Sequence, residues 1–451
     1  MEAVTIDNLA KAVRGEALKG DKNGQINKVI IDSRAIAEGG VFFAVKGENT
    51  DGHLYINQAI QNGAKAVVVH NDIDFRDIDS AVIKVTDTTQ ALLDFCGYYR
   101  SLFDIKVIAV TGSSGKTTTK DIISSVLSQK YATLKTQGNF NNQTGMPQTI
   151  FNLNSHHEMA VIEMGMSREG EIYNMAKAIK PDMAVITNIG YSHIEYLKTR
   201  ENILKAKMEI TSFFGQNNTL LVNADDFYLQ NISSDDYKII KTGIQHGDIK
   251  VTDIAQSGNG CKFKVDGQLY TFPLIGLHNV YNCLYAITIA KIYGLSDKDI
   301  QKGFDTFKPS SNRMDISVTD GITVINDVYN SNPQAARAAL DVLAGTGQGR
   351  KIAVLADMLE LGGYSKTLHE EIGSYAAAAG ADILIAIGKE AKYIYNSALG
   401  EGIKEAEYFP DNPSAAEYLK SLLLPGDTVL FKGSRGMKLE TIIKILFPKE
   451  N

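Results

Sequence analysis

Residues 106–123 read KVIAVTGSSGKTTTKDII, which is an apolar run, a glycine turn, a lysine, three threonines and a helical pattern. This order predicts a buried strand, a tight loop and a helix, the setting of a phosphate-binding loop. Gly112 and Gly115 let backbone N–H groups approach phosphate oxygens. The helix that begins near Thr117 directs its positive end at them, and Lys116 adds a mobile charge. We therefore expect nucleotide phosphates here, with Thr117 as a Mg²⁺ ligand.

This loop is shorter than the usual pattern. That pattern has a glycine five positions before the glycine of the Gly-Lys pair, where this chain has Val110, and Gly112 lies three positions before it. A glycine turn that caps a helix by chance is the alternative, but the strand, glycines, lysine, threonine and helix all agree. Nucleotide binding alone does not decide among a kinase, a motor, a switch GTPase and a ligase.

Composition limits the remaining possibilities. A chain of 451 residues predicts roughly three domains, and 44% hydrophobic with 22% charged residues is typical of globular proteins. A net charge of −6 gives no basic field for nucleic acid. The N-terminus has no signal pattern and no apolar run reaches the roughly 20 residues of a spanning helix, so we expect a cytoplasmic protein. Cys96, Cys261 and Cys283 are widely spaced and predict buried thiols.

The apolar runs predict an α/β fold of three domains. A small N-terminal α/β module spans 1–85, a central phosphate-loop domain with a mostly parallel sheet spans 86–310, and a Rossmann-like doubly wound domain spans 311–451. We expect a helix near 54–62, another at 88–103, and strands within 29–33, 41–47, 64–70, 106–111, 159–165, 182–188, 322–327, 351–357, 382–388 and 427–433. Open α/β sheets place ligands at the carboxyl ends of their strands, where Asp327, Asp357 and Lys432 stand.

Three residues outside the loop are candidates for binding metal or supplying charge beside the phosphates. Glu163 ends the run MAVIE and His193 follows AVITN, so both should project at the carboxyl edge of the sheet. A carboxylate is a natural Mg²⁺ ligand, whereas an imidazole is less usual, and a loop histidine without a metal is the alternative. Lys207 lies on the apolar stripe of a predicted helix, whereas Lys205 faces away. It either snorkels to the surface or carries a functional charge.

Further motifs give the chain a resemblance to the Mur ligase family over essentially its whole length. The segments are TGSSGKTTTK (111–120), GNFNNQTGMP (138–147), EMGMS (163–167), TNIGYSHIEYL (187–197), KAKMEI (205–210), GLHNVYN (276–282), NRMDI (312–316), DVYNSNP (327–333), DMLELG (357–362) with His369, and FKGSRGMKLE (431–440). Within the family, DVYNSNP, DMLELG and KGSRGMK resemble the member that adds D-alanyl-D-alanine to UDP-N-acetylmuramoyl-tripeptide. The DYAHTP-like segment usual in the tripeptide-making sibling is absent.

The resemblance implies an enzyme that forms an amide from those two substrates and ATP, giving ADP and phosphate, and we expect a monomer. Phosphorylating a carboxylate makes an acyl phosphate that an amine can attack. The family pattern implies two Mg²⁺ ions, one held by Thr117 and Glu163 and one by His193 with a carbamylated Lys207. Lys116, Lys207 and His193 are then the catalytic residues. Carbamylation turns an ammonium into a carboxylate-like anion, which suits both an inward position and a cation.

The resemblance also implies a nucleotide-binding set. Its residues are Gly112, Ser113, Ser114, Gly115, Lys116, Thr117, Thr118, Asn279, Arg313, Asp327 and Tyr329. Asn279 would lie near the adenine, or else cap the following helix. Arg313, Asp327 and Tyr329 would contact phosphate, ribose and base, although Arg313 also suits a solvated hinge. Asn332 and Pro333 predict an N-cap followed by proline at the first helical position.

The implied substrate-binding residues are Asp32, Ser33, Arg34, Asn139, Asn142, Gln143, Thr144, Lys432, Ser434 and Arg435. The first three would meet the uridine diphosphate end, unless the Asp-Ser pair is a helix cap. The amide cluster suits sugar and peptide groups, or only a turn. The last three suit the dipeptide carboxylate, or are solvated. Three other functions stay open: a ligase adding the third amino acid, a nucleotide-dependent switch or assembly ATPase, and a folate-polyglutamate ligase, which would lack the N-terminal module.

Overall fold

The computed structural model describes residues 1–448 apart from 36, 48–49, 73, 75–78, 258–259 and 311. Contacts divide the chain into two compact units. One unit comprises Met1–Val110, Tyr131–Ala184 and Met208–Thr219, and the other comprises Thr111–Lys130, Val185–Lys207 and Leu220–Asn451. The predicted domain boundary at 310–311 includes residue 311, which lies outside the described residues. The division into three domains stays a prediction. Each apolar run that predicted a strand overlaps one.

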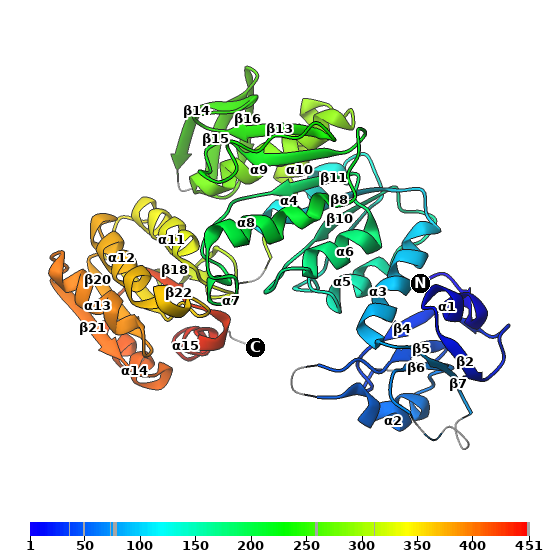
Figure 1. Cartoon of the computed structure of the whole chain (residues 1–451). Helices are drawn as coiled ribbons and strands as arrows, with labels where there is room; N and C mark the ends of the chain where they lie inside the picture. Colours follow the sequence, from blue (N-terminus) through cyan, green and yellow to red (C-terminus); the bar gives the residue numbers. More distant parts are fainter. Residues whose placement is uncertain are drawn as a thin grey trace. The chain divides into compact units, whose positions relative to one another are not determined.

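An N-terminal five-stranded sheet, blue in Figure 1, has the order β2-β7-β6-β5-β4. Its bounds are β2 Glu16–Lys19, β4 Lys28–Ile30, β5 Gly40–Phe43, β6 Ala66–Val69 and β7 Ala81–Lys84. Strands β4 to β7 pair in parallel and β2 pairs antiparallel with β7. Helix α2 (Ile56–Gln61), preceded by a 3₁₀ turn at Gly52–Tyr55, buries Ile56 and Ala59 against this sheet. A short pair, β1 (Val4–Thr5) and β3 (Gln25–Ile26), flanks α1 (Ile6–Ala12).

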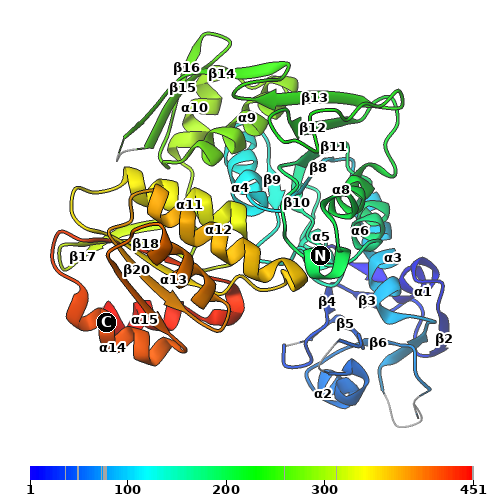
Figure 2. The same cartoon turned by 60° about the vertical axis from the view of Figure 1, so that its left-hand side comes forward.

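The central sheet has nine strands in the order β16-β15-β14-β13-β12-β11-β8-β10-β9. Strands β8, β9 and β10 are parallel, whereas β14, β15 and β16 form an antiparallel ribbon beside α9 and α10 (Figure 2). The strand bounds are β8 Lys106–Thr111, β9 Thr133–Lys135, β10 Met159–Glu163, β11 Met183–Ile186, β12 Thr219–Asn223, β13 Lys238–Gly243, β14 Ile249–Ser257, β15 Gly260–Val265 and β16 Gln268–Phe272. The helices of this region are α3 Thr88–Ser101, α4 Lys116–Leu127, α5 Gly145–Ile150, α6 Glu171–Ile179, α7 Ile194–Leu197, α8 Arg200–Met208, α9 Leu277–Ile292 and α10 Asp297–Asp305, with a 3₁₀ turn at Glu209–Thr211.

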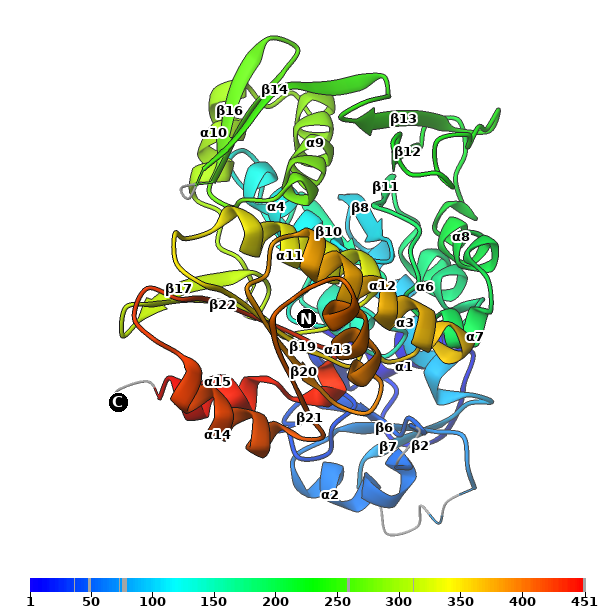
Figure 3. The same cartoon turned by 90° about the vertical axis from the view of Figure 1, so that its left-hand side faces the viewer.

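A six-stranded sheet lies within residues 312–448, here called the C-terminal segment, in the order β17-β18-β22-β19-β20-β21. Only the edge strand β17 is antiparallel. Helices α11–α13 cover one face and α14–α15 the other, as Figure 3 shows, which confirms the doubly wound prediction. The bounds are β17 Asp315–Thr319, β18 Ile322–Asp327, α11 Pro333–Gly345, β19 Lys351–Ala356, α12 Ser365–Ala378, β20 Ile383–Ile387, α13 Ala391–Gly400, β21 Glu405–Phe409, α14 Asn412–Leu422, β22 Thr428–Lys432 and α15 Glu440–Leu446, with 3₁₀ turns at Gly362–Tyr364 and Arg435–Met437.

Two composition-based expectations are answered by the fold. The three cysteines are free and buried, as predicted, and burial raises the pKa of Cys261 to about 11. Among the described residues, no helix has both the length and the apolar character that crossing a membrane requires.

Candidate active site

The predicted phosphate loop joins β8 to α4. Gly112 has φ +149°, and a Cβ there would lie 1.8 Å from Thr187 Oγ1, so only glycine fits. Gly115 has φ +78° and is the N-cap of α4, where a Cβ would lie 3.2 Å from Asn282 Oδ1. Lys116 Nζ donates to the Gly112 carbonyl at 2.8 Å. The loop therefore has the close backbone approach and the helix N-terminus that bind phosphate.

Two residues after β11 hold the loop in this conformation. Asn188 accepts from the Ser114 amide at its Oδ1 (3.0 Å) and donates from Nδ2 to the Ser114 carbonyl (3.1 Å). Thr187 Oγ1 donates to the same carbonyl at 2.6 Å, and Ser113 N–H donates to the Asn188 carbonyl at 3.0 Å. Both residues belong to the segment 187–197, and the sequence predicted no role for either of them. The sequence feature that could have identified them is their position as two polar residues directly after an apolar strand.

Glu163 carries an unsatisfied oxygen at the end of β10. The residue is 1% exposed, and its Oε1 accepts from Asn141 Nδ2 at 2.7 Å. Its Oε2 is buried with no hydrogen-bond partner among the described residues, a state that calls for a ligand. The predicted partner Thr117 is also buried, in the first turn of α4. Sequence reasoning missed Asn141, although it lies inside the quoted segment 138–147.

Oxygen donors of this kind fit Mg²⁺, which prefers carboxylate and hydroxyl ligands. Among the described residues, no three His, Cys, Asp or Glu side chains group as a metal site of their own. The predicted sets, Thr117 with Glu163 and His193 with Lys207, do not require such a group. The metal assignments remain predictions that the orphaned oxygen of Glu163 supports.

Lys207 is 2% exposed on α8, whereas Lys205 is exposed, as the apolar stripe predicted. The snorkelling alternative for Lys207 is therefore wrong. Burial, and after it the charge of Lys116, hold the pKa of Lys207 well below its ordinary value. A buried lysine near the phosphate-loop lysine is costly as an ammonium and favourable as a neutral amine.

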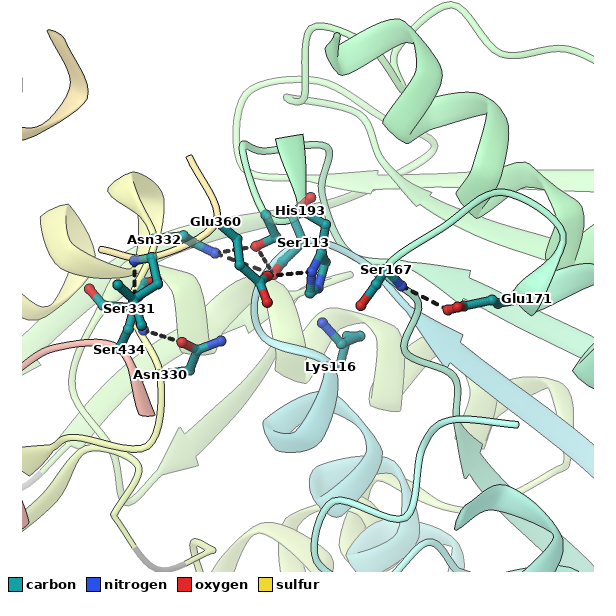
Figure 4. A network of polar contacts seen from close by, with 12 residues as sticks. Ser113, Lys116, Ser167, Glu171, His193, Asn330, Ser331, Asn332, Glu360 and Ser434 are labelled. Carbon is teal, nitrogen blue, oxygen red and sulfur yellow. Dashed lines mark hydrogen bonds and ion pairs between the residues drawn. The ribbon is translucent and has the colours of Figure 1, made fainter. Parts of the chain in front are cut away.

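His193 lies at the N-terminus of α7 with φ +63°. Its Nδ1 is 2.6 Å from Oε2 of Glu360, a residue of the C-terminal segment (Figure 4). The ring and the carboxylate are close but not aligned for a regular hydrogen bond. Contact with the His193 ring nevertheless holds the pKa of the Glu360 carboxyl below its ordinary value. Glu360 was not among the predicted site residues.

The predicted ribose and base residues lie together in the C-terminal segment. The Arg313 guanidinium stacks 3.8 Å from the centroid of the Tyr329 ring. Asp327 ends β18 and pairs with Lys432 Nζ at 2.6 Å, and Lys432 also donates to the Asn330 carbonyl at 2.7 Å. Lys432, predicted for the dipeptide carboxylate, is thus buried next to the predicted ribose residue.

The two other residues predicted for the dipeptide carboxylate, Ser434 and Arg435, closely follow the end of β22. Ser434 is buried, and its Oγ accepts from the Leu359 amide at 2.8 Å. The Arg435 guanidinium lies 5.9 Å from the centroid of the Tyr329 ring and forms a partly exposed ion pair with Glu440. Asp357, also at a strand end, accepts from three amides at the start of α13, which gives it a capping role.

The two predicted asparagine caps have different outcomes. Asn279 is not a cap, because Gly276 occupies that position and Asn279 Nδ2 donates to the Ile275 carbonyl at 2.8 Å. Asn332 is the N-cap of α11, followed by Pro333, as predicted. Its Nδ2 also donates to Ser192 Oγ at 2.7 Å and to the Ser113 carbonyl at 3.3 Å (Figure 4), a bridge to the phosphate loop that the sequence did not reveal.

Two of the predicted uridine-diphosphate residues, Asp32 and Arg34, are exposed, whereas Ser33 between them is buried. Arg34 donates to both carboxylate oxygens of Asp32, which, with the Arg34 amide, lowers the pKa of Asp32 to about 2. Ser33 Oγ donates to Gln58 Oε1 at 2.7 Å. No helix begins at residues 32–35, so the helix-cap alternative is wrong. The substrate role of these three residues stays a prediction.

The predicted amide cluster before α5 has a structural role in part. Asn142 Oδ1 accepts from the Gly145 amide at 2.7 Å and from Thr144 Oγ1 at 3.2 Å. Gln143 Oε1 accepts from Asn174 Nδ2 at 2.9 Å, and Asn139 is exposed. The turn alternative therefore holds for Asn142, and the sugar and peptide contacts stay predictions.

Comparisons with known proteins give a consistent result. Family models described as "Mur ligase family, catalytic domain", "Mur ligase middle domain" and "Mur ligase, glutamate ligase domain" match residues 25–100, 110–290 and 312–435. The UDP-N-acetylmuramoyl-tripeptide–D-alanyl-D-alanine ligase of Bacillus subtilis is 38% identical over 448 residues, which cover 98% of each chain. The crystal structure of MurF from Acinetobacter baumannii superposes with a TM-score of 0.92 at 32% identity over 100% of both chains. That of MurF from Thermotoga maritima, in complex with ADP, gives 0.83 at 29% identity over 93% of this chain and 96% of that one.

Proposed function

The chain belongs to the Mur ligase family, and we propose that it uses ATP to join D-alanyl-D-alanine to UDP-N-acetylmuramoyl-tripeptide, releasing ADP and phosphate. The observation that carries this proposal is the braced phosphate loop, which Asn332 of the C-terminal segment contacts directly. Loop and C-terminal segment lie in one compact unit. The predicted ribose and base residues Asp327 and Tyr329 belong to that same unit, so the nucleotide would lie between them and the loop.

The reaction proceeds in two steps. The terminal carboxylate oxygen of the tripeptide attacks the γ-phosphorus of ATP, the bond to the β-bridging oxygen breaks, and ADP leaves. The amine of the dipeptide then attacks the carbonyl carbon of the acyl phosphate, phosphate leaves and the amine loses a proton. Lys116 and the N-terminus of α4 stabilise the charge on the phosphoryl group during transfer.

Two Mg²⁺ ions would add positive charge at the phosphates, one held by Thr117 and Glu163 and one by His193 and Lys207. Glu163 Oε2 is poised for such a role because it is buried without another partner among the described residues. We assign Lys207 as carbamylated. Its lowered pKa favours the neutral amine, which adds CO₂ with loss of a proton. The resulting anion removes the repulsion between Lys207 and Lys116.

Substrate binding extends the proposal to the rest of the chain. Residues 1–85 would hold the uridine-diphosphate sugar through Asp32, Ser33 and Arg34, and residues 86–310 and 311–451 would form the ATP-binding and ligase domains. The neutral amides near 139–144 would hold sugar and peptide groups. We assign the dipeptide carboxylate to Ser434 and Arg435 together with Lys432. A monomer in the cytoplasm, where ATP is available, suits this reaction.

Phosphate release tests the function directly. With UDP-N-acetylmuramoyl-tripeptide and ATP, we expect release to require D-alanyl-D-alanine, and Lys116→Ala to lower it by about 100-fold or more. Phosphate release at the same rate with and without D-alanyl-D-alanine would identify a switch or assembly ATPase. Amide formation between a free amino acid and UDP-N-acetylmuramoyl-dipeptide would identify the ligase that adds the third residue.

A further inference from the structure

His193 and Glu360, whose side chains are in contact, each have an unfavourable backbone conformation. His193 has φ +63° and Glu360 has φ +62°, a left-handed region that residues with a Cβ rarely adopt. Nδ1 and Oε2 nevertheless meet at 2.6 Å. Non-glycine residues persist in this region when the surrounding structure imposes it, and such residues gather at functional sites.

The surroundings of Glu360 do impose its position. On the His193 side, the Glu360 carbonyl accepts from the Glu195 amide at 3.1 Å. Gly362, with φ +52°, packs so closely that a Cβ there would lie 3.2 Å from Glu195 Cα. Tyr364 Oη donates to the Lys198 carbonyl at 3.3 Å. Residues 360–364 therefore attach along residues 193–198 at several points.

The other side of the same loop is attached to the C-terminal segment. The Leu359 amide donates to Ser434 Oγ at 2.8 Å, and the Met358 amide donates to His369 Nε2 at 3.0 Å. His369 is fully buried, and its Nδ1 bonds the Ser365 carbonyl at 2.7 Å. Glu360 is thus presented to His193 by a loop fixed at both ends.

We propose that Glu360 is a positioning residue that acts through His193. A histidine that binds a metal through one ring nitrogen commonly has the other held by a carboxylate, which fixes the ring and raises its basicity. Glu360 contacts Nδ1 and so leaves Nε2, on the opposite side of the ring, for the second Mg²⁺ ion. This inference rests on the proposed role of His193 as a ligand.

The arrangement links the metal to the C-terminal segment. Glu360 belongs to that segment, whereas His193 follows a strand of the central sheet. If the contact between Glu360 and His193 strengthens metal binding, then metal binding must strengthen that contact by the same free energy. The second Mg²⁺ ion would therefore hold the loop at 360–364 against residues 193–198, and that loop would complete the metal site.

Mn²⁺ binding tests this linkage without relying on turnover. The probe is Mn²⁺ with a non-hydrolysable ATP analogue, followed by electron paramagnetic resonance, in which a coordinated imidazole gives a ¹⁴N modulation. We compare wild type with His193→Ala, Glu360→Gln and Glu360→Gly. Glycine suits the left-handed backbone, so the Glu360→Gly variant removes the carboxylate without threatening the fold. Glu371→Gln is the matched control, because Glu371 forms an exposed pair with Arg337 in the same segment.

We expect His193→Ala to abolish the ¹⁴N modulation, and both Glu360 variants to weaken Mn²⁺ binding at the nitrogen-coordinated site by about 10–100-fold, with Glu371→Gln unchanged. If His193→Ala loses the signal while both Glu360 variants bind Mn²⁺ within about twofold of wild type, or more tightly, the inference is overturned and the proposed function survives. If His193→Ala keeps the signal, His193 is not a ligand and the proposed metal site fails with it.

Discussion

Asn332 has two roles that a pair of substitutions separates. Its Oδ1 accepts from the Ala335 amide at 2.8 Å, which caps α11, and its Nδ2 donates to Ser192 Oγ and to the Ser113 carbonyl at 2.7 and 3.3 Å. Serine is as good an N-cap as asparagine, but its side chain is too short to reach the loop. Asn332→Ser therefore removes only the bridge, whereas Asn332→Ala removes the bridge and the cap.

The magnitudes follow from these contacts. Two neutral hydrogen bonds of about 0.5–1.5 kcal/mol each give about 1–3 kcal/mol for the bridge. If nucleotide binding needs the bridge, that energy corresponds to a loss of affinity of about 5–150-fold in both variants. The cap contributes about 0.5–2 kcal/mol, so Asn332→Ala should be less stable than Asn332→Ser by that amount.

Calorimetric titration with a non-hydrolysable ATP analogue measures the bridge, and urea unfolding of both variants measures the cap. We expect equal losses of affinity and unequal stabilities. An Asn332→Ser variant that binds the analogue as tightly as wild type would show that the contact with Ser113 has no part in nucleotide binding. Equal unfolding midpoints for the two variants would show that the cap contributes nothing.

Two further predictions concern charge. Labelled ¹³C-bicarbonate should give a carbamate signal in wild type that is missing in Lys207→Arg, and removing CO₂ should lower activity reversibly; activity that is indifferent to CO₂, without such a signal, would contradict carbamylation. Arg34→Gln should raise the pKa of Asp32 from about 2 toward its ordinary range in a carboxyl ¹³C titration, because the Arg34 side chain is the largest cause of the shift and the backbone amide of residue 34 remains. Stability from this pair is present above that ordinary pKa and fades as pH falls toward about 2, so wild type and variant should converge there.

Local patterns explain the correct predictions. The strand, glycines and helix of 106–123 are contiguous, and each element has its own signal. The burial of Lys207 followed from helical periodicity, and the cap at Asn332 followed from the proline after it. Such signals depend only on neighbours within a few residues, so a single sequence contains them.

Contacts between distant segments explain what was missed. Asp327 and Lys432 are register partners of β18 and β22, and only the strand order brings them together. The bridge from Asn332 and the contact of Glu360 with His193 likewise join segments more than 100 residues apart. In 138–147, no periodicity distinguishes Asn141, which meets Glu163, from Asn142, which meets Gly145. Strands β14 and β21 escaped prediction because most of their residues are exposed or only partly buried.

The central claim is that ATP activates the tripeptide carboxylate as an acyl phosphate. UDP-N-acetylmuramoyl-tripeptide labelled with ¹⁸O at both oxygens of its terminal carboxylate tests it most directly, by mass spectrometry of the phosphate released during amide formation with D-alanyl-D-alanine. Attack by the carboxylate on the γ-phosphorus predicts one ¹⁸O atom in each phosphate, since the anhydride oxygen leaves with phosphorus. Amide product accompanied by unlabelled phosphate would contradict the account.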